Sequence, residues 1–199
     1  MTGGVRRRIA VLLSGRGSNF EAIAESVESG AIPDAEIVAV VSDVAEAVGL
    51  ERARRRGLPA FAVDRGKFAS KWEHEAEILR ILEEVRPDLI CLAGYMRVLS
   101  PEFVARFGGR ILNIHPALLP KFRGLHAQRR ALEAGETVSG CTVHFVDEGT
   151  DTGPVILQRT VPILPGDTEE SLSERILVEE HRAYPEAIAR VLSGAADKL

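Results

Sequence analysis

The sequence of 199 residues contains only two cysteines, Cys91 and Cys141, which is too few for a disulfide scaffold. Both lie in apolar runs without the spacing of a metal site, so we expect buried thiols in a reducing compartment. No apolar stretch approaches the ~20 residues of a membrane span. The apolar run Ile9–Leu13 is shorter than the ~7–15 residues of a signal-peptide core. These absences predict a soluble, cytoplasmic protein that does not bind membranes.

An excess of positive charge is also missing. The chain has 25 Lys and Arg against 29 Asp and Glu, a net charge of −4, and its pI is about 5.8. Proteins dedicated to nucleic acids are usually basic, so we expect no nucleic-acid partner, although a local cationic pocket for a small anion is compatible with this total. Repeats, low-complexity tracts and Pro/Gly-rich linkers are absent as well, which predicts a single domain spanning residues 1–199.

Short apolar, β-branched runs alternate with longer segments of helical spacing. The runs are Ile9–Leu13, Ile37–Val41, Ala60–Val63, Leu89–Leu92 and Ile111–Ile114. Continuous apolar runs are typical of parallel strands that are buried on both faces. The pattern therefore predicts an α/β fold, a doubly wound, Rossmann-like and mostly parallel sheet with helices on both faces.

Two helices can be placed by their apolar spacing. Steps of three and four residues predict a helix that ends before Pro87 and buries Trp72, Ala76, Leu79, Leu82 and Val85. Asp167 and Glu170 have the spacing of a capping box at the start of the last helix. The inner face of that helix is predicted to carry Leu172, Ile176, Tyr184, Ile188 and Val191. Before it, the strand-like runs Cys141–Val146 and Val155–Val161 are joined by a short loop, which predicts a mixed C-terminal edge of the sheet.

The segment Ser14-Gly-Arg-Gly-Ser-Asn19 joins the first predicted strand to a helix. Glycines let a ligand approach the backbone, and free N–H groups at a helix start bind phosphate. Ser18 or Asn19 is expected to cap the helix. The motif is not G-x-G-x-x-G, and a tight turn without a ligand is the alternative interpretation. Ligand crevices at the carboxyl ends of strands favour the binding role.

A polar pair, Asn113 and His115, ends the fifth predicted strand. Residues two apart on a strand point to the same face, so these side chains should project together while Ile114 packs behind. Histidine transfers protons near neutral pH, and an asparagine amide can donate to a developing oxyanion. A structural polar pair is the alternative.

The acidic segment Asp147–Gly153 lies between the two late strands. It is either a solvated connection or a loop that brings one carboxylate to His115, which would raise the pKa of the imidazole. Its spacing matches no calcium or zinc pattern, so we expect no metal. His144, just before the loop, is also close enough along the chain to approach such a site.

The segment Gly94–Leu99 follows the fourth predicted strand and brackets Arg97 with apolar residues. Such a loop suits a flat aromatic ligand that carries a carboxylate. The alternative is a set of core residues beside a surface arginine.

Four segments together resemble the family of phosphoribosylglycinamide formyltransferases over nearly the whole chain. They are Ser14–Asn19, Ala93-Gly-Tyr-Met-Arg-Val-Leu99, Leu112-Asn-Ile-His-Pro-Ala-Leu-Leu-Pro120 and Val143–Ile156. The resemblance implies a catalytic group of Asn113, His115 and Asp151. It implies that Gly17, Ser18, Asn19 and Glu180 bind a ribonucleotide, its phosphate at the glycine loop. It further implies that Lys71, Met96, Arg97, Val98, Leu99 and Asn113 bind the folate.

The activity implied by this resemblance is formyl transfer from 10-formyltetrahydrofolate to the amine of glycinamide ribonucleotide, with a phosphate-binding N-terminal half and a folate-binding, catalytic C-terminal half. The small molecules are then the expected partners of a monomer or homodimer. Formyltetrahydrofolate deformylase is the nearest alternative, but that family has an extra N-terminal module, and here the first predicted strand begins by Ile9. Methionyl-tRNA formyltransferase has a C-terminal extension that we do not find here. A nucleotide-binding module without turnover is an alternative of another class.

Overall fold

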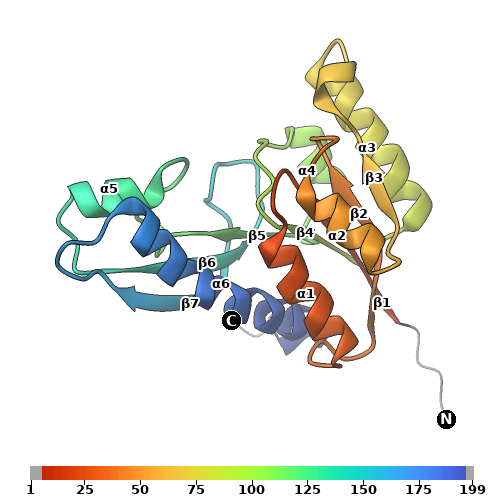
Figure 1. Ribbon diagram of the computed structural model, residues 1–199. Coiled ribbons are helices and arrows are strands. Elements are labelled where there is room, and N and C mark those ends of the chain that lie inside the picture. The colour runs from red at the N-terminus through yellow and green to blue at the C-terminus, as the bar shows by residue number, and fades with distance from the viewer. Residues whose placement is uncertain (1–5, 196–199) are drawn as a thin grey trace. The chain divides into compact units, whose positions relative to one another are not determined.

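The computed structural model describes residues 6–195, and the chain divides into two compact units, Met1–Leu112 and Asn113–Leu199. Figure 1 labels the elements. In chain order they are β1 (Arg7–Leu13), α1 (Ser18–Glu28), β2 (Ala35–Ser42), α2 (Val48–Arg55), β3 (Ala60–Ala62), the 3-10 turn η1 (Arg65–Lys67), α3 (Lys71–Val85), β4 (Leu89–Leu92), α4 (Pro101–Arg106), β5 (Ile111–His115), α5 (Ala127–Glu133), β6 (Val138–Phe145), β7 (Val155–Pro162) and α6 (Glu169–Leu192).

The first unit is built on parallel strands in the order β3-β2-β1-β4. All five residues of Ile9–Leu13 are fully buried, because β1 has a neighbouring strand on each side and helices over its faces. The chain winds from β1 to β3 and then returns to β4. Right-handed crossovers therefore place α1 and α2 on one face and α3 on the other, and Figure 1 shows α1 beside α2.

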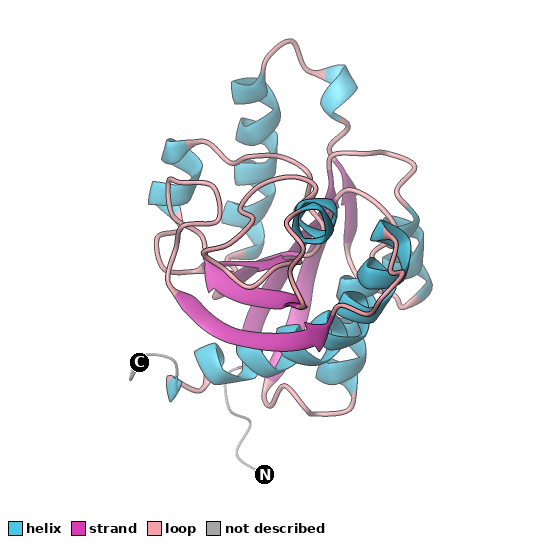
Figure 2. Ribbon diagram, turned by 90° about the vertical axis from the view of Figure 1, so that its left-hand side faces the viewer, coloured by secondary structure: helices cyan, strands magenta, loops and turns pink. Residues whose placement is uncertain are grey.

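Along the sheet the strand order is β3-β2-β1-β4-β5-β6-β7, and the first unit ends within β5. In the second unit β6 and β7 run antiparallel, with Val138 opposite Pro162 and Val143 opposite Leu157. The helix α6 packs against both strands; Figure 2 draws helices in cyan and strands in magenta. The predicted mostly parallel α/β sheet with a mixed C-terminal edge is thus confirmed.

The predicted inner face of α3 is wrong in part: Leu82 is fully buried as predicted, whereas Ala76, Leu79 and Val85 are only half-buried. Trp72 is 75% exposed, and the fully buried positions include His74, Ile78 and Ile81. The prediction counted only apolar residues, whereas the buried His74 ring meets its polar need with Nε2 2.8 Å from the Val63 carbonyl oxygen. The helix ends before Pro87, as predicted.

The start of α6 also differs by one residue. Thr168 is the N-cap and forms a capping box with Ser171. The Asp167 carboxylate is occupied by Arg175 Nη1 at 2.6 Å and the Leu164 N–H at 2.7 Å, so it is not available as the cap.

On the inner face of α6, the predicted residues Leu172, Ile176, Tyr184 and Ile188 are fully buried, whereas Val191 is half-buried. Within residues 6–195, none of the helices combines the length and the apolar character needed to cross a membrane.

Candidate active site

The end of β5 presents Asn113 and His115 to the same carboxylate. Asn113 Nδ2 lies 3.3 Å from Asp151 Oδ1, and His115 Nδ1 lies 3.3 Å from Asp151 Oδ2. Between them Ile114 is buried on the opposite side of the strand. The structure therefore brings together, within the second unit, an amide, an imidazole and a carboxylate from two segments of the chain.

The loop between β6 and β7 has the backbone geometry to aim Asp151. Asp151 has φ of 54°, in the left-handed region that few residues other than glycine and asparagine or aspartate adopt. Within the loop, Asp147 Oδ1 accepts a hydrogen bond from the Thr152 hydroxyl at 2.6 Å. Gly153 is required by space, because a Cβ there would collide with the Phe145 carbonyl group. The loop is therefore an ordered support for one carboxylate.

The Asp151 carboxylate is charged well below neutral pH. Burial alone would raise its pKa, but a hydrogen bond with His144, the Gly124 N–H at 2.8 Å and the nearby His115 together lower the pKa to about 2. Asp151 therefore enters any reaction at neutral pH as an anion and as a hydrogen-bond acceptor.

The pKa of His115 shifts opposite to the predicted direction. Burial is the largest influence and lowers the pKa below 6.5, which outweighs the raising effects of Asp151 and of the Phe122 carbonyl. The prediction considered only the carboxylate and missed the desolvation of a ring that is 5% exposed. His115 Nε2 lies 2.9 Å from the Phe122 oxygen. Both ring nitrogens thus face oxygen atoms that accept hydrogen bonds. A neutral imidazole carries only one N–H, so its other nitrogen lies opposite an acceptor and has no proton to donate.

His144 joins the same cluster, which the sequence indicated only by its position before the acidic loop. The buried ring has Nε2 3.2 Å from Asn113 Nδ2 and 3.5 Å from Asp151 Oδ1, and Nδ1 2.8 Å from the Phe145 carbonyl oxygen. We use the name polar cluster for Asn113, His115, His144 and Asp151. Every side chain of the cluster has protein partners, and several of these contacts are long, at 3.2–3.5 Å. A bound substrate can therefore displace the weakest of them.

The turn after β5 is held by two residues, Thr142 and Gln158, that no sequence motif distinguishes. Thr142 Oγ1 donates to the Ala117 carbonyl at 2.6 Å and accepts the Leu119 N–H at 3.1 Å. Gln158 Nε2 donates to the Leu119 carbonyl and to Thr142 Oγ1, both at 2.9 Å. The turn leads to the segment that supplies the Phe122 carbonyl and Gly124 N–H of the site, so these bonds determine where that segment begins.

In the first unit, the loop Ser14–Asn19 leads into α1, which begins at Ser18. Gly17 is the N-cap with φ of 73° and has no side chain to cap the helix, so the predicted cap by Ser18 or Asn19 is wrong. The N-terminal end of a helix attracts anions, and a glycine at the N-cap lets a ligand approach the backbone there. A Cβ at Gly17 would meet Gly49 Cα at 2.7 Å, so this position needs glycine for both its φ and its space.

The loop after β4 combines exposed apolar residues with a tethered arginine. Met96 is 69% and Val98 is 66% exposed, whereas Leu99 is buried. Arg97 Nε lies 3.0 Å from Asp43 Oδ2. A hollow of about 300 Å³ is lined by Lys71, Met96, Arg97 and Val98, together with Arg65 and Tyr95 among others. Four of the five residues that the resemblance assigns to folate in this unit thus line one hollow, and the fifth, Leu99, is buried.

Glu180, the fourth residue assigned to the ribonucleotide, lies on α6 in the second unit and is buried.

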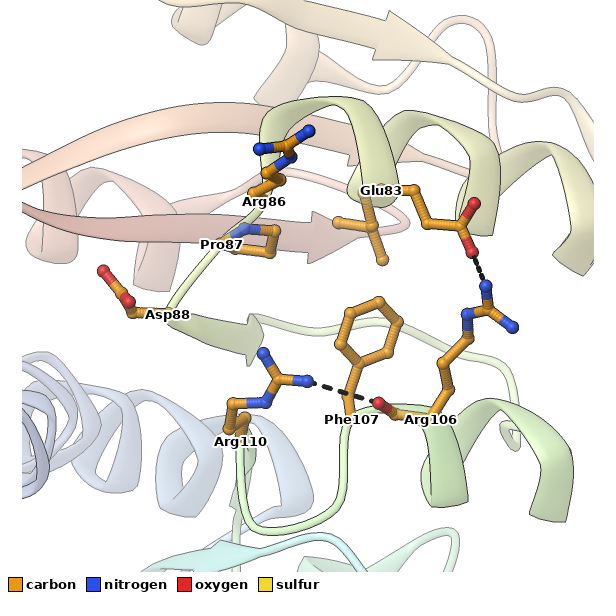
Figure 3. Close-up of a pocket in the computed structure, with 8 residues that line it drawn as sticks. Glu83, Arg86, Pro87, Asp88, Arg106, Phe107 and Arg110 are labelled. Atoms are coloured by element: carbon orange, nitrogen blue, oxygen red, sulfur yellow. Dashed lines mark hydrogen bonds and ion pairs between the residues drawn. The ribbon is translucent and has the colours of Figure 1, made fainter.

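A larger hollow of about 550 Å³ lies near the start of β4 and is lined by Arg86, Asp88, Arg106 and Phe107, among others (Figure 3). Arg106 forms an ion pair with Glu83 there. In open α/β sheets, ligands bind outside the carboxyl ends of the strands, and this hollow is at the amino end of β4. The hollow therefore lies at the end of β4 opposite to the loop at Met96, and a substitution there can serve as a control.

Comparisons with known proteins agree on one family. Residues 7–188 match the formyl transferase family model. The chain is 53% identical over 195 residues to the trifunctional purine biosynthetic protein adenosine-3 of Drosophila pseudoobscura pseudoobscura, covering 98% of this chain but 14% of that protein. It is 44% identical over 186 residues to the phosphoribosylglycinamide formyltransferase of Escherichia coli (strain K12), covering 94% of this chain and 87% of that protein.

A solved structure has the same fold. Glycinamide ribonucleotide transformylase 1 from Symbiobacterium toebii superimposes with a TM-score of 0.93 at 51% identity, covering 96% of this chain and 90% of that chain.

Proposed function

Because the chain belongs to the formyl transferase family, we propose that it transfers the formyl group of 10-formyltetrahydrofolate to the amine of 5-phosphoribosylglycinamide in purine biosynthesis. The products are formylglycinamide ribonucleotide and tetrahydrofolate. The observation that carries the proposal is the polar cluster, which lies within the region matched to the family. The names of the relatives that cover most of their own length, such as the Escherichia coli protein, favour this substrate.

The chemistry requires stabilisation of negative charge on one oxygen. Attack of the amine on the formyl carbon forms a C–N bond and moves an electron pair to the formyl oxygen. That pair then re-forms the C=O bond as the bond between the formyl carbon and the folate nitrogen breaks, and the folate nitrogen takes up the proton that the amine loses. The Asn113 amide is a neutral donor for this oxygen and needs no change of protonation. Its contacts with His144 and Asp151 in the free protein are long enough to be given up for a stronger acceptor.

His115 and Asp151 are assigned to hydrogen bonding with the oxyanion and to transfer of the amine proton. His115 is neutral before reaction because burial lowers its pKa. As negative charge develops beside the ring, the protonated form becomes more favourable, and the anionic Asp151 stabilises it. We assign His115 as the second oxyanion donor: the ring takes up one proton from solvent and donates it through Nε2, which must leave the Phe122 carbonyl oxygen that lies 2.9 Å away in the free protein. Asp151 also places the water that carries the amine proton toward the departing folate nitrogen. The step needs no covalent enzyme intermediate.

The remaining site residues form two groups, one for each substrate. Gly17, Ser18 and Asn19 bind the ribonucleotide phosphate at the start of α1, where the N-cap is a glycine. Glu180 contacts the ribonucleotide, and Lys71 with Met96–Leu99 receives the folate. We treat residues 1–199 as one functional domain of a cytoplasmic enzyme, a monomer or homodimer, with no metal.

One mixing experiment tests the proposal against its alternatives. The protein is incubated with 10-formyltetrahydrofolate, with and without glycinamide ribonucleotide, and formation of tetrahydrofolate is followed. Loss of formyl that depends on the amine supports the transferase. Loss without the amine identifies a deformylase, in which water is the acceptor, and no loss identifies a binding module.

A further inference from the structure

Asp43, the residue directly after β2, has a buried carboxylate that serves two loops of the first unit. It is 4% exposed. Oδ1 accepts the hydroxyl hydrogen of Ser14 at 2.5 Å, and Oδ2 accepts from Arg97 Nε at 3.0 Å. Burying a carboxylate costs free energy unless it is paired, and here each oxygen has a partner. Both partners come from the loops that follow β1 and β4.

Ser14 transmits the contact to the backbone of the second loop. Its only hydroxyl hydrogen points to Asp43, so the oxygen is left to accept the Met96 N–H at 2.8 Å. Ser14 N–H also donates to the Gly94 carbonyl at 3.1 Å. The loop at 94–98 is thus held at Gly94, Met96 and Arg97, and two of these three points depend on Asp43.

These polar contacts explain how exposed apolar side chains keep a defined place. Met96 and Val98 face solvent over most of their surface and gain little from packing. Their positions therefore depend on the backbone beneath them, which is fixed by hydrogen bonds. An apolar surface that is pre-organised in this way binds a flat ligand without the entropic cost of ordering the loop.

We propose that Asp43 is a positioning residue that holds the loop Gly94–Val98 in the conformation that receives formyl-folate, directly through Arg97 and indirectly through Ser14. This inference rests on the proposed function for its substrate. Its structural part, the dependence of the Met96 amide on Asp43, concerns contacts of the first unit alone.

Asp43→Asn tests it, because an asparagine oxygen can accept from Ser14 or from Arg97, while its NH₂ group then faces the other donor. We expect KM for 10-formyltetrahydrofolate to rise about tenfold, equivalent to ~1.4 kcal/mol, with kcat changed by less than about threefold. Hydrogen exchange of the Met96 amide should accelerate about tenfold. Ser14→Ala removes only the indirect route, so it should accelerate Met96 exchange with a smaller rise in KM.

The matched control is Glu83→Gln, which removes another arginine–carboxylate pair of the same unit, with Arg106 at the hollow of Figure 3. It should change neither KM nor Met96 exchange. If the native protein transfers no formyl group, the proposed function fails, and Met96 exchange still decides the role of Asp43.

Two results overturn the inference. One is a native-like KM together with unchanged Met96 exchange in Asp43→Asn. If Asp43→Asn does not fold, as judged by circular dichroism, the deciding result is Ser14→Ala with native Met96 exchange.

Discussion

Replacing Asn113 with alanine removes an amide whose Nδ2 lies 3.2 Å from His144 Nε2 and 3.3 Å from Asp151 Oδ1. The partners left behind keep other hydrogen bonds. Asp151 still accepts the Gly124 N–H at 2.8 Å, and His144 Nδ1 still faces the Phe145 carbonyl at 2.8 Å. The fold therefore loses two long contacts and leaves neither partner without a hydrogen bond.

The expected losses in stability and in catalysis differ in size. Loss of net hydrogen bonding costs about 1 kcal/mol of unfolding free energy, a shift in Tm of roughly 2–4 °C for a protein of this length. Loss of one oxyanion donor raises the reaction barrier by about 2.7–4 kcal/mol, so kcat should fall roughly 10²–10³-fold. A destabilisation of ~1 kcal/mol cannot produce that fall in a protein that stays folded at the assay temperature.

The assay measures kcat from the release of tetrahydrofolate, beside a thermal melt followed by circular dichroism. Ile114→Val is the control, because it removes one methylene from the neighbouring residue on β5 and costs about 0.5–1.5 kcal/mol while leaving the amide in place. The control should keep native kcat. An Asn113→Ala protein with a native-like melt and a kcat within about tenfold of native would refute the oxyanion role.

Three further predictions concern the same two units. Asp151→Asn should lower kcat at least ~10²-fold, whereas Glu148→Gln, an exposed acid of the same loop, should leave it unchanged, as steady-state kinetics will show. Gly17→Ala should raise KM for the ribonucleotide more than KM for the folate, because the new Cβ meets Gly49 Cα at 2.7 Å and shifts the start of α1; equal changes in both constants would contradict this. The lowered pKa of His115 means that the unfolded chain takes up a proton near pH 6.5 before the folded protein does, so the unfolding free energy should fall as pH drops below about 6.5. Denaturant titrations between pH 7.5 and 5.5 should show a flatter dependence in His115→Asn.

Elements that are buried on all sides could be predicted from the sequence. The β4 bounds Leu89–Leu92 agree with the prediction, because a continuous apolar run has one stable place in a parallel sheet. The burial of α3 could not be read in the same way, because His74 is a core residue only by virtue of the Val63 carbonyl. Its hydrogen-bond partner lies outside the helix, where periodicity carries no information.

The features of the candidate site also differ in how far the sequence could predict them. The projection of Asn113 and His115 to one side follows from strand geometry, and the structure confirms it. Asp151 was distinguished from the other acids of its loop only by family resemblance, since its aim depends on a left-handed backbone residue. The pKa direction of His115 was missed because it depends on how deeply the ring is buried, a property of the whole second unit.

Every side chain of the polar cluster already contacts a protein partner, so a neutral ligand gains little by binding there. A neutral amide or alcohol that enters would replace bonds to a carboxylate and an imidazole with bonds of no greater strength. Only an oxygen that gains charge as it reacts competes successfully for those hydrogens. The protein then distinguishes its substrate from other ligands during the chemical step itself, by the negative charge that develops on the reacting oxygen as well as by the shape of the substrate.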